Sequence, residues 1–127
     1  YRAVLAIYAL GDLEPSIHPA AFVHPDAVVI GDVTIGADSS IWPGAVLRGD
    51  GGSIRIGART SVQDNAVLHT TPEWPTVVGD GCVLGHLIHL EGCTIEDDVL
   101  VTRDGCEVLS RFVPTDPEAI EALIRAA

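Results

Sequence analysis

An aliphatic residue recurs at every sixth position through most of this sequence, and this period restricts the fold more than any other feature. The longest unbroken run consists of Ile17, Val23, Val29, Ile35, Ile41 and Leu47. The spacing returns in two further runs, made of Ile56, Val62 and Leu68, and of Val78, Leu84 and Leu90. An α-helix repeats every ~3.6 residues and a strand about every two, so neither element by itself explains the pattern.

Small residues often occupy the fourth position after these aliphatic residues. The clearest examples are Ala21, Ala27, Ser39, Ala45, Thr60, Ala66 and Cys82. One large and one small inward residue per six describe one flat side of a solenoid, and three sides close a coil of about 18 residues. Successive coils then stack at the strand spacing of roughly 4.8 Å. The sequence therefore predicts an all-β fold, a parallel β-helix of hexapeptide repeats with about five coils, whose handedness the spacing leaves open.

Two interruptions of the period and the C-terminal segment set the predicted domain limits. We expect loops between Leu47 and Ile56 and between Leu68 and Val78, and function tends to lie in loops that leave a regular scaffold. Residues 114–127 carry a cap and an apolar stripe typical of a short α-helix. The prediction is a β-helix over residues 1–113 and a helix over 114–127 that packs on it.

The charge balance excludes two classes of partner. With 18 acidic and 7 basic residues, the net charge is −11, whereas nucleic acids and anionic membrane surfaces attract cationic proteins. No stretch reaches the roughly 18 apolar residues of a membrane span. The three cysteines form no closely spaced pair, which favours reduced thiols and a cytoplasmic location.

The coil register predicts where charged residues meet. Arg48, His69 and Glu91 each directly follow a period residue on the same side of the coil. They should therefore stack in one outward column, about one strand spacing apart. A plain surface ion pair is the simpler explanation for Arg48 and Asp50.

His69 and Glu91 in one column would suit a shared divalent metal. Catalytic zinc typically takes three protein ligands, and His86 falls on a different side of the coil, as do Gln63 and Asp64. His86 would then complete the site of a neighbouring subunit, which predicts a metal site at a subunit interface and cyclic trimer symmetry. His89, at the corner before the column, competes for the place of third ligand.

Several motifs resemble those of the gamma-class carbonic anhydrases and their relatives among the hexapeptide-repeat proteins. They are IGDVTIG at 30–36, SIWPGAVLRGD at 40–50, SVQDNAVLH at 61–69, PTVVGDGCVLGH at 75–86 and EGCTIEDDVLV at 91–101. The resemblance runs from about residue 11 to 113. It implies a left-handed parallel β-helix, a homotrimer, and a zinc or iron ion held by three histidines at each subunit interface.

The resemblance also assigns roles to individual residues. His69 matches the first metal ligand and His86 the second, while Gln63 matches the residue that hydrogen-bonds solvent on the metal. Arg48 and Asp64 match residues of interface ion pairs, with Asp50 beside them.

The chain departs from the family pattern in two ways. Where the third histidine is expected it has Glu91, with His89 two residues earlier. A set of two histidines and one glutamate is a known zinc site, so we favour Glu91 as ligand; in the alternative His89 binds the metal and Glu91 accepts a proton. The repeat also degrades early, and Glu73 is the one nearby candidate for a proton shuttle.

These patterns together favour reversible hydration of CO2 to bicarbonate by a metal-dependent homotrimer. Zinc is the expected metal, with iron or cobalt as alternatives. Two other functions stay open: a metal-binding structural trimer without turnover, and an acyltransferase. The acidic composition weighs against the acyltransferase, because a CoA-type donor needs a cationic pocket for its phosphates.

Overall fold

The computed structural model describes residues 5–96, 99–102 and 105–108. The chain divides into two compact units, Tyr1–Glu96 and Asp97–Ala127, each of which is described by itself.

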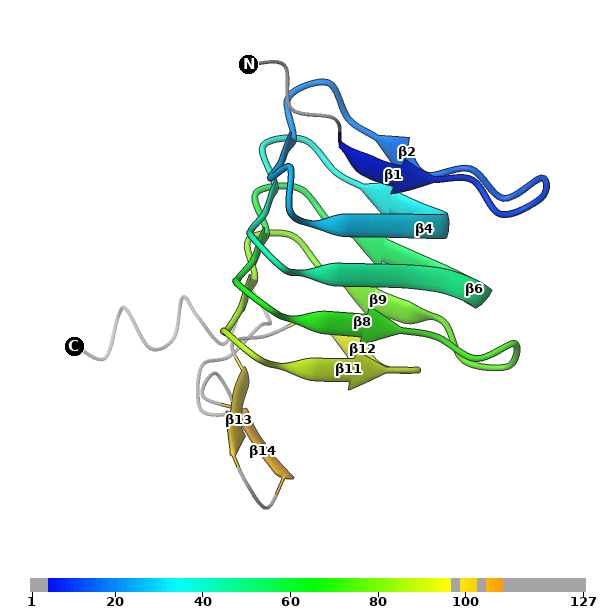
Figure 1. Ribbon diagram of the computed structural model, residues 1–127. Coiled ribbons are helices and arrows are strands. Elements are labelled where there is room, and N and C mark those ends of the chain that lie inside the picture. Colours follow the sequence, from blue (N-terminus) through cyan, green and yellow to red (C-terminus); the bar gives the residue numbers. More distant parts are fainter. Residues whose placement is uncertain (1–4, 97–98, 103–104, 109–127) are drawn as a thin grey trace, which may run out of the picture. The chain divides into compact units, whose positions relative to one another are not determined.

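The first unit is a solenoid of short parallel strands (Figure 1). One face carries, in spatial order, β1 (Ala6–Tyr8), β4 (Val28–Ile35), β6 (Val46–Ile56), β8 (Val67–His69) and β11 (His89–Glu91). A second face carries β3 (Phe22–Val23), β5 (Ser40–Ile41), β7 (Ser61–Val62) and β10 (Val83–Leu84). The later halves of β4 and β6 form the third face with β2 (Ser16–Ile17), β9 (Thr76–Val78) and β12 (Thr94–Ile95). About four turns lie in the described residues, and the expected parallel β-helix is confirmed.

The residues of the six-residue period form the interior of this solenoid. Their exposed fractions are 1% or less at Val29, Ile35, Ile41, Leu47, Val62, Leu68 and Val78. Ile17 and Ile95, at the two ends of the series, pack against this core. Each buried aliphatic side chain contributes about 1.5–3 kcal/mol, so the period that predicts the coil also supplies its stability.

The chain between Leu47 and Ile56 is a strand and not the loop that the break in the period predicts. β6 runs unbroken around one corner and pairs with β4 on both sides of it, with a register shift between Gly31 and Val33. A side chain at Gly31 would overlap the carbonyl oxygen of Gly49, so glycine allows the two strands to bend together. The loop expected between Leu68 and Val78 is present and joins β8 to β9.

The second unit begins differently. β13 (Val99–Thr102) and β14 (Gly105–Val108) form an antiparallel hairpin, in contrast to the parallel coils of the first unit. The helix expected at 114–127 lies outside the described residues, so that helix and the boundary after residue 113 stay predictions. Across the described residues, no helix is long and apolar enough to cross a membrane.

One corner of the solenoid is strained. Gly44, Asn65 and Leu87 each come third after a buried period residue, and all three have left-handed backbones, with φ of 72°, 57° and 62°. Glycine and asparagine adopt this conformation readily, but other L-residues do so at a cost of roughly 1–2 kcal/mol. The Leu87 side chain is 77% exposed, so little packing offsets the cost.

Replacing Leu87 should therefore stabilise the chain. We expect Leu87→Asn and Leu87→Gly to raise the free energy of unfolding of the single chain by about 0.5–1 kcal/mol, measured by urea denaturation at a concentration at which the chain is monomeric. Leu87→Ala is the matched control, because it removes the exposed side chain but keeps the Cβ that causes the strain. An equal gain in Leu87→Ala would show that backbone strain is not the cause.

Candidate metal centre

The structure confirms the predicted column. Arg48 on β6 lies opposite His69 on β8, and His69 lies opposite Glu91 on β11. Because neighbouring strands are parallel and in register, the three side chains leave the same face one above the other.

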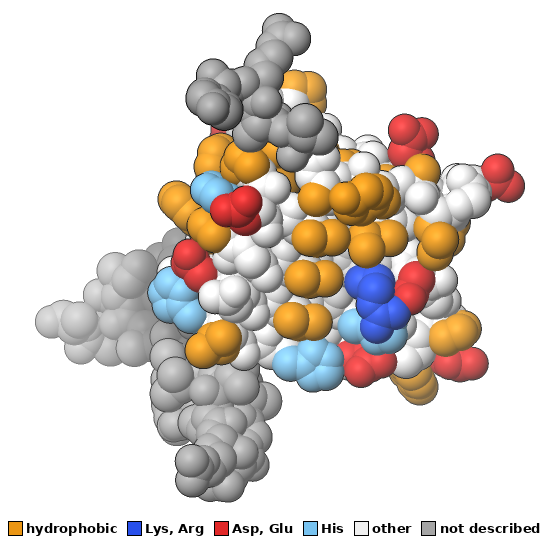
Figure 2. All heavy atoms as spheres, viewed as in Figure 1, with side chains coloured by type: hydrophobic (Ala, Val, Ile, Leu, Met, Phe, Trp, Pro, Cys, Tyr) orange, Lys and Arg blue, Asp and Glu red, His pale blue; other side chains and the backbone are white. Residues whose placement is uncertain are grey.

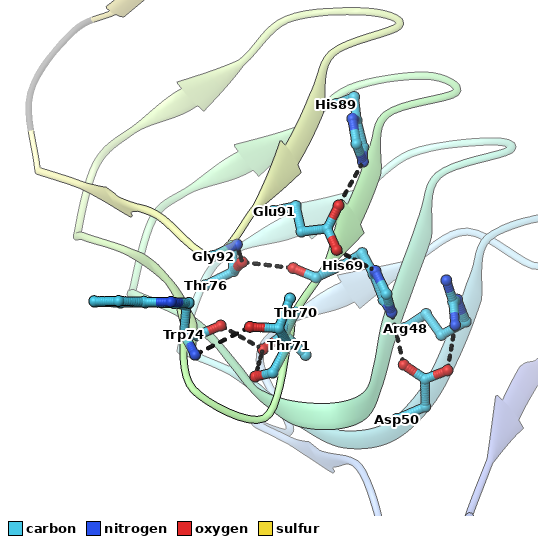
Figure 3. A network of polar contacts seen from close by, with 10 residues as sticks. All are labelled: Arg48, Asp50, His69, Thr70, Thr71, Trp74, Thr76, His89, Glu91 and Gly92. Carbon is cyan, nitrogen blue, oxygen red and sulfur yellow. Dashed lines mark hydrogen bonds and ion pairs between the residues drawn. The ribbon is translucent and has the colours of Figure 1, made fainter.

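The imidazole of His69 lies between two carboxylates (Figure 3). Its Nε2 is 2.8 Å from Asp50 Oδ1, and its Nδ1 is 3.0 Å from Glu91 Oε1. Asp50 stands two residues beyond Arg48 on β6, where the register with β4 shifts, and its carboxylate reaches the imidazole of His69. The contact between Asp50 and His69 was not predicted, because it depends on the unbroken course of β6.

Arg48 completes this network from the other side of Asp50, with which it forms an ion pair. Burial alone would raise the pKa of Asp50, but the hydrogen bonds from His69 and Arg48 and the charge of Arg48 outweigh it, so the pKa of Asp50 lies below its usual value. Asp50 is therefore an anion that fixes one ring nitrogen of His69.

His89 belongs to the neighbouring outward column, opposite Val67. Its Nε2 lies 3.8 Å from Glu91 Oε2, and its side chain is 62% exposed. Glu91 is thus the acidic group that contacts both histidines. In Figure 3, the contacts drawn connect His89 to Glu91 and Glu91 to His69, and none joins the two histidines directly.

The second histidine predicted as a ligand lies on the second face. His86, just after β10, pairs with Asp64, just after β7, at 3.1 Å between Nδ1 and Oδ2. Gln63 precedes Asp64 on this face, and its backbone N–H donates to Leu84. The predicted ligands of one chain therefore lie in two separate groups, called the two half-sites below, and its described residues contain no group of three or more metal-binding side chains.

The loop after β8 is held by threonines. The Thr70 hydroxyl donates to the Trp74 carbonyl at 2.9 Å, and the Trp74 amide donates to the Thr71 hydroxyl at 3.2 Å. Glu73, the candidate proton shuttle, is exposed in this loop. The hydroxyl of Thr76 donates to the backbone carbonyl of His69, a contact that the six-residue period does not predict. Its signal in the sequence is a polar residue at the position that Val33 and Ile54 occupy in the two preceding coils.

Apolar side chains line the same face above the histidines (Figure 2). Val28, Val46 and Val67 form one outward column that ends at His89, and Val67 is 39% exposed. The second face exposes Phe22, Trp42, Val83 and Leu87. Each half-site thus borders an uncovered apolar surface.

The lowered pKa of Asp50 predicts a pH-dependent contribution to stability. Its ion pair with Arg48 and its hydrogen bond with His69 stabilise the fold above the usual pKa of a carboxyl group, and this contribution is lost as the pH falls through the lowered pKa. Asp50→Asn should therefore reduce the free energy of unfolding by about 1 kcal/mol near neutral pH, and by progressively less in acid. Urea denaturation at a series of pH values measures the difference, with Asp26→Asn, whose carboxylate is 79% exposed, as control. A difference that does not change with pH would contradict this assignment.

Comparison with known proteins places this geometry in a family. The family model for the bacterial transferase hexapeptide (six repeats) matches residues 14–49. The mitochondrial gamma carbonic anhydrase 3 of Arabidopsis thaliana is 46% identical over 107 residues, which are 80% of this chain and 40% of the relative. The carnitine operon protein CaiE of Escherichia coli O157:H7 is 44% identical over 97 residues, 76% of this chain and 50% of the relative.

Solved structures agree with this placement. A hexapeptide transferase family protein from Anaplasma phagocytophilum superposes with a TM-score of 0.67 at 41% identity, over 74% of this chain and 54% of the other. A Bacillus cereus putative acetyltransferase shares the fold, with a TM-score of 0.58 at 20% identity. The chain spans about half or less of the length of the curated relatives it matches. It belongs to the gamma carbonic anhydrase-like family of hexapeptide-repeat proteins.

Proposed function

We propose that this chain is the subunit of a homotrimeric metalloenzyme that hydrates CO2 reversibly to bicarbonate. The observation that carries the proposal is the division of the histidines: His69 stands beside Glu91 on one face, and His86 stands on the next face. The 46% identity to a gamma carbonic anhydrase supports the choice of reaction. The proposed site forms where the first face of one copy meets the second face of another.

The uncovered apolar surfaces support a homotrimer. The valine column of the first face and the aromatic pair Phe22 and Trp42 of the second, whose ring centroids are 5.6 Å apart, border the two half-sites. When unlike faces of identical chains meet, the chains form a closed ring of three if each copy is rotated by one third of a turn relative to the next. The faces of a triangular coil are related by about this angle. Burial of these side chains would hold the half-sites together.

The donor set suits a divalent metal such as zinc, with iron or cobalt as alternatives. His69, Glu91 and His86 of the partner subunit would hold it, and when bound it supplies Lewis-acid activation of a water molecule for attack on CO2. Metal-binding histidines usually donate their second ring N–H to a carboxylate. Asp50 occupies that position at Nε2 of His69, 2.8 Å away, with Arg48 holding Asp50 in turn.

Other residues of the chain would handle the water and its proton. Gln63 lies on the same face as His86, so the partner subunit would contribute both, and an amide there would orient the reacting water by a hydrogen bond. Glu73, exposed beside the first face, is the candidate that carries the proton to solvent.

The cytoplasmic location expected from the cysteines stays a prediction, since the plant relatives are named as mitochondrial.

Two alternative functions have an observation in their favour. Glu91 in the expected place of a histidine favours a metal-binding trimer without turnover. The family model and a similar structure that carry the name transferase favour acyl transfer. A metal-replete protein with no hydration rate supports the first, and stabilisation by an acyl-CoA in thermal unfolding supports the second.

Loss of either histidine should abolish both metal binding and turnover. We expect His69→Ala and His86→Ala to lower bound zinc to near background and kcat/KM for CO2 hydration by at least about 100-fold, because each removes a ligand. Metal analysis and stopped-flow pH-indicator assays measure the two effects. His18→Ala, on a turn before β3, is the control and should behave as wild type. Wild-type protein without metal or without hydration above buffer would contradict the proposal.

The third ligand can be assigned by three variants. If Glu91 binds the metal, Glu91→Gln should weaken zinc affinity by about 10-fold or more, and His89→Gln should change it by less than about threefold. Glu91→His should retain zinc, because it supplies an imidazole at the same place. The reverse order for Glu91→Gln and His89→Gln assigns the ligand to His89 and the proton-accepting role to Glu91.

A further inference from the structure

Thr76 is a buried polar residue at an aliphatic position of the repeat. It begins β9 and lies opposite Ile54, which in turn lies opposite Val33 on the coil above. All three side chains are in the interior, and Thr76 has no exposed surface. A hydroxyl in such a place is costly unless its hydrogen bonds are made, so its partners explain why it is there.

The hydroxyl of Thr76 bridges the two strands that carry the candidate ligands (Figure 3). It donates to the carbonyl oxygen of His69 at 2.5 Å and accepts the amide N–H of Gly92 at 2.9 Å. His69 is the last residue of β8, and Gly92 directly follows Glu91, the last residue of β11. Both the proton and a lone pair of the hydroxyl are used.

This bridge extends the ladder between β8 and β11 past its last paired residues. The backbone pairing ends at His69 and Glu91, because the chain leaves β8 there for the loop 70–75. In a parallel ladder the amide of one strand donates to a carbonyl of the next. At Gly92 the acceptor is instead the hydroxyl of Thr76, and this hydroxyl donates its own proton to the carbonyl of His69.

The pairing of β9 with β6 fixes the position of Thr76. Its own strand pairs with β6, since Thr76, Val77 and Val78 lie opposite Ile54, Arg55 and Ile56. A side chain anchored in this way holds the two backbones at a constant separation. The contact of 3.0 Å between His69 Nδ1 and Glu91 Oε1 depends on that separation.

We propose that Thr76 is a positioning residue, whose hydroxyl holds His69 and Glu91 together as a preformed pair of metal donors. The role toward metal depends on the proposed function, whereas the bridge itself does not. Thr76→Val keeps the shape and removes the hydroxyl, and Thr76→Ser keeps the hydroxyl. Thr70→Val is the matched control, because it removes another buried hydroxyl of the same turn that bonds only within the loop.

The first measurement uses the metal-free chain and NMR. In wild type and Thr76→Ser, the Gly92 amide should exchange slowly, because the Thr76 hydroxyl accepts its N–H. In Thr76→Val, the Gly92 amide should exchange at least about 10-fold faster relative to other core amides. A Gly92 amide of wild-type protein that exchanges as fast as an exposed amide overturns the proposal, even if Thr76→Val fails to fold.

The second measurement is Co2+ affinity, by competition with a chelator. We expect Thr76→Val to bind Co2+ about 10-fold more weakly than wild type, with Thr76→Ser and Thr70→Val within about threefold. Equal weakening in Thr70→Val and Thr76→Val, or none in a folded Thr76→Val, overturns the positioning role. Wild-type protein that binds no Co2+ refutes the proposed function instead, and the NMR result then still decides whether Thr76 bridges the two strands.

Discussion

The in-register stacking of parallel strands is the constraint on which the rest of this structure depends. Each coil advances by one strand spacing, so a residue's place in the six-residue repeat fixes both its face and its vertical neighbours. Arg48, His69 and Glu91 meet for this reason, although the first and the last lie 43 positions apart in the sequence. The same constraint places His86 on another face, so that in the proposed trimer two copies of the chain would share the metal ligands.

Around His69 the scaffold adds fixed charges and a fixed backbone. Asp50 and Glu91 approach the two ring nitrogens, Arg48 holds Asp50, and Thr76 ties the end of β8 to the residue after β11. The chain has 18 acidic residues, and two of them, Asp50 and Glu91, contact the imidazole of His69 and orient it. In the proposed metal site, Asp50 would orient His69 through Nε2, and Nδ1 would face Glu91, the second donor.

The sequence alone predicts the repeat, the interior residues and the Arg48–His69–Glu91 column, because all three follow from counting in sixes. It does not predict the Asp50 contact or the Thr76 bridge. These depend on places where the period breaks: β6 turns a corner without interruption opposite the register shift between Gly31 and Val33, and the loop after β8 ends the ladder at His69. The sequence shows that Glu91 stands where the family has a histidine. It does not show which side chains surround Glu91, and these determine what the carboxylate can do. The sequence also does not predict the backbone strain at Leu87, because the coil and not the residue type sets the backbone angles at this corner.

The division of the site between subunits can be tested by mixing two inactive variants. His69→Ala and His86→Ala proteins, unfolded together and reassembled at equal concentration, should regain about a quarter of the wild-type metal, because each interface draws an intact half-site from each side with a chance of one half. Metal content of the purified mixture, compared with each variant reassembled alone, is the readout. Recovery near that fraction supports a site shared by two copies. A mixture as empty as the separate variants would contradict it, since ligands supplied by a single chain cannot complement each other.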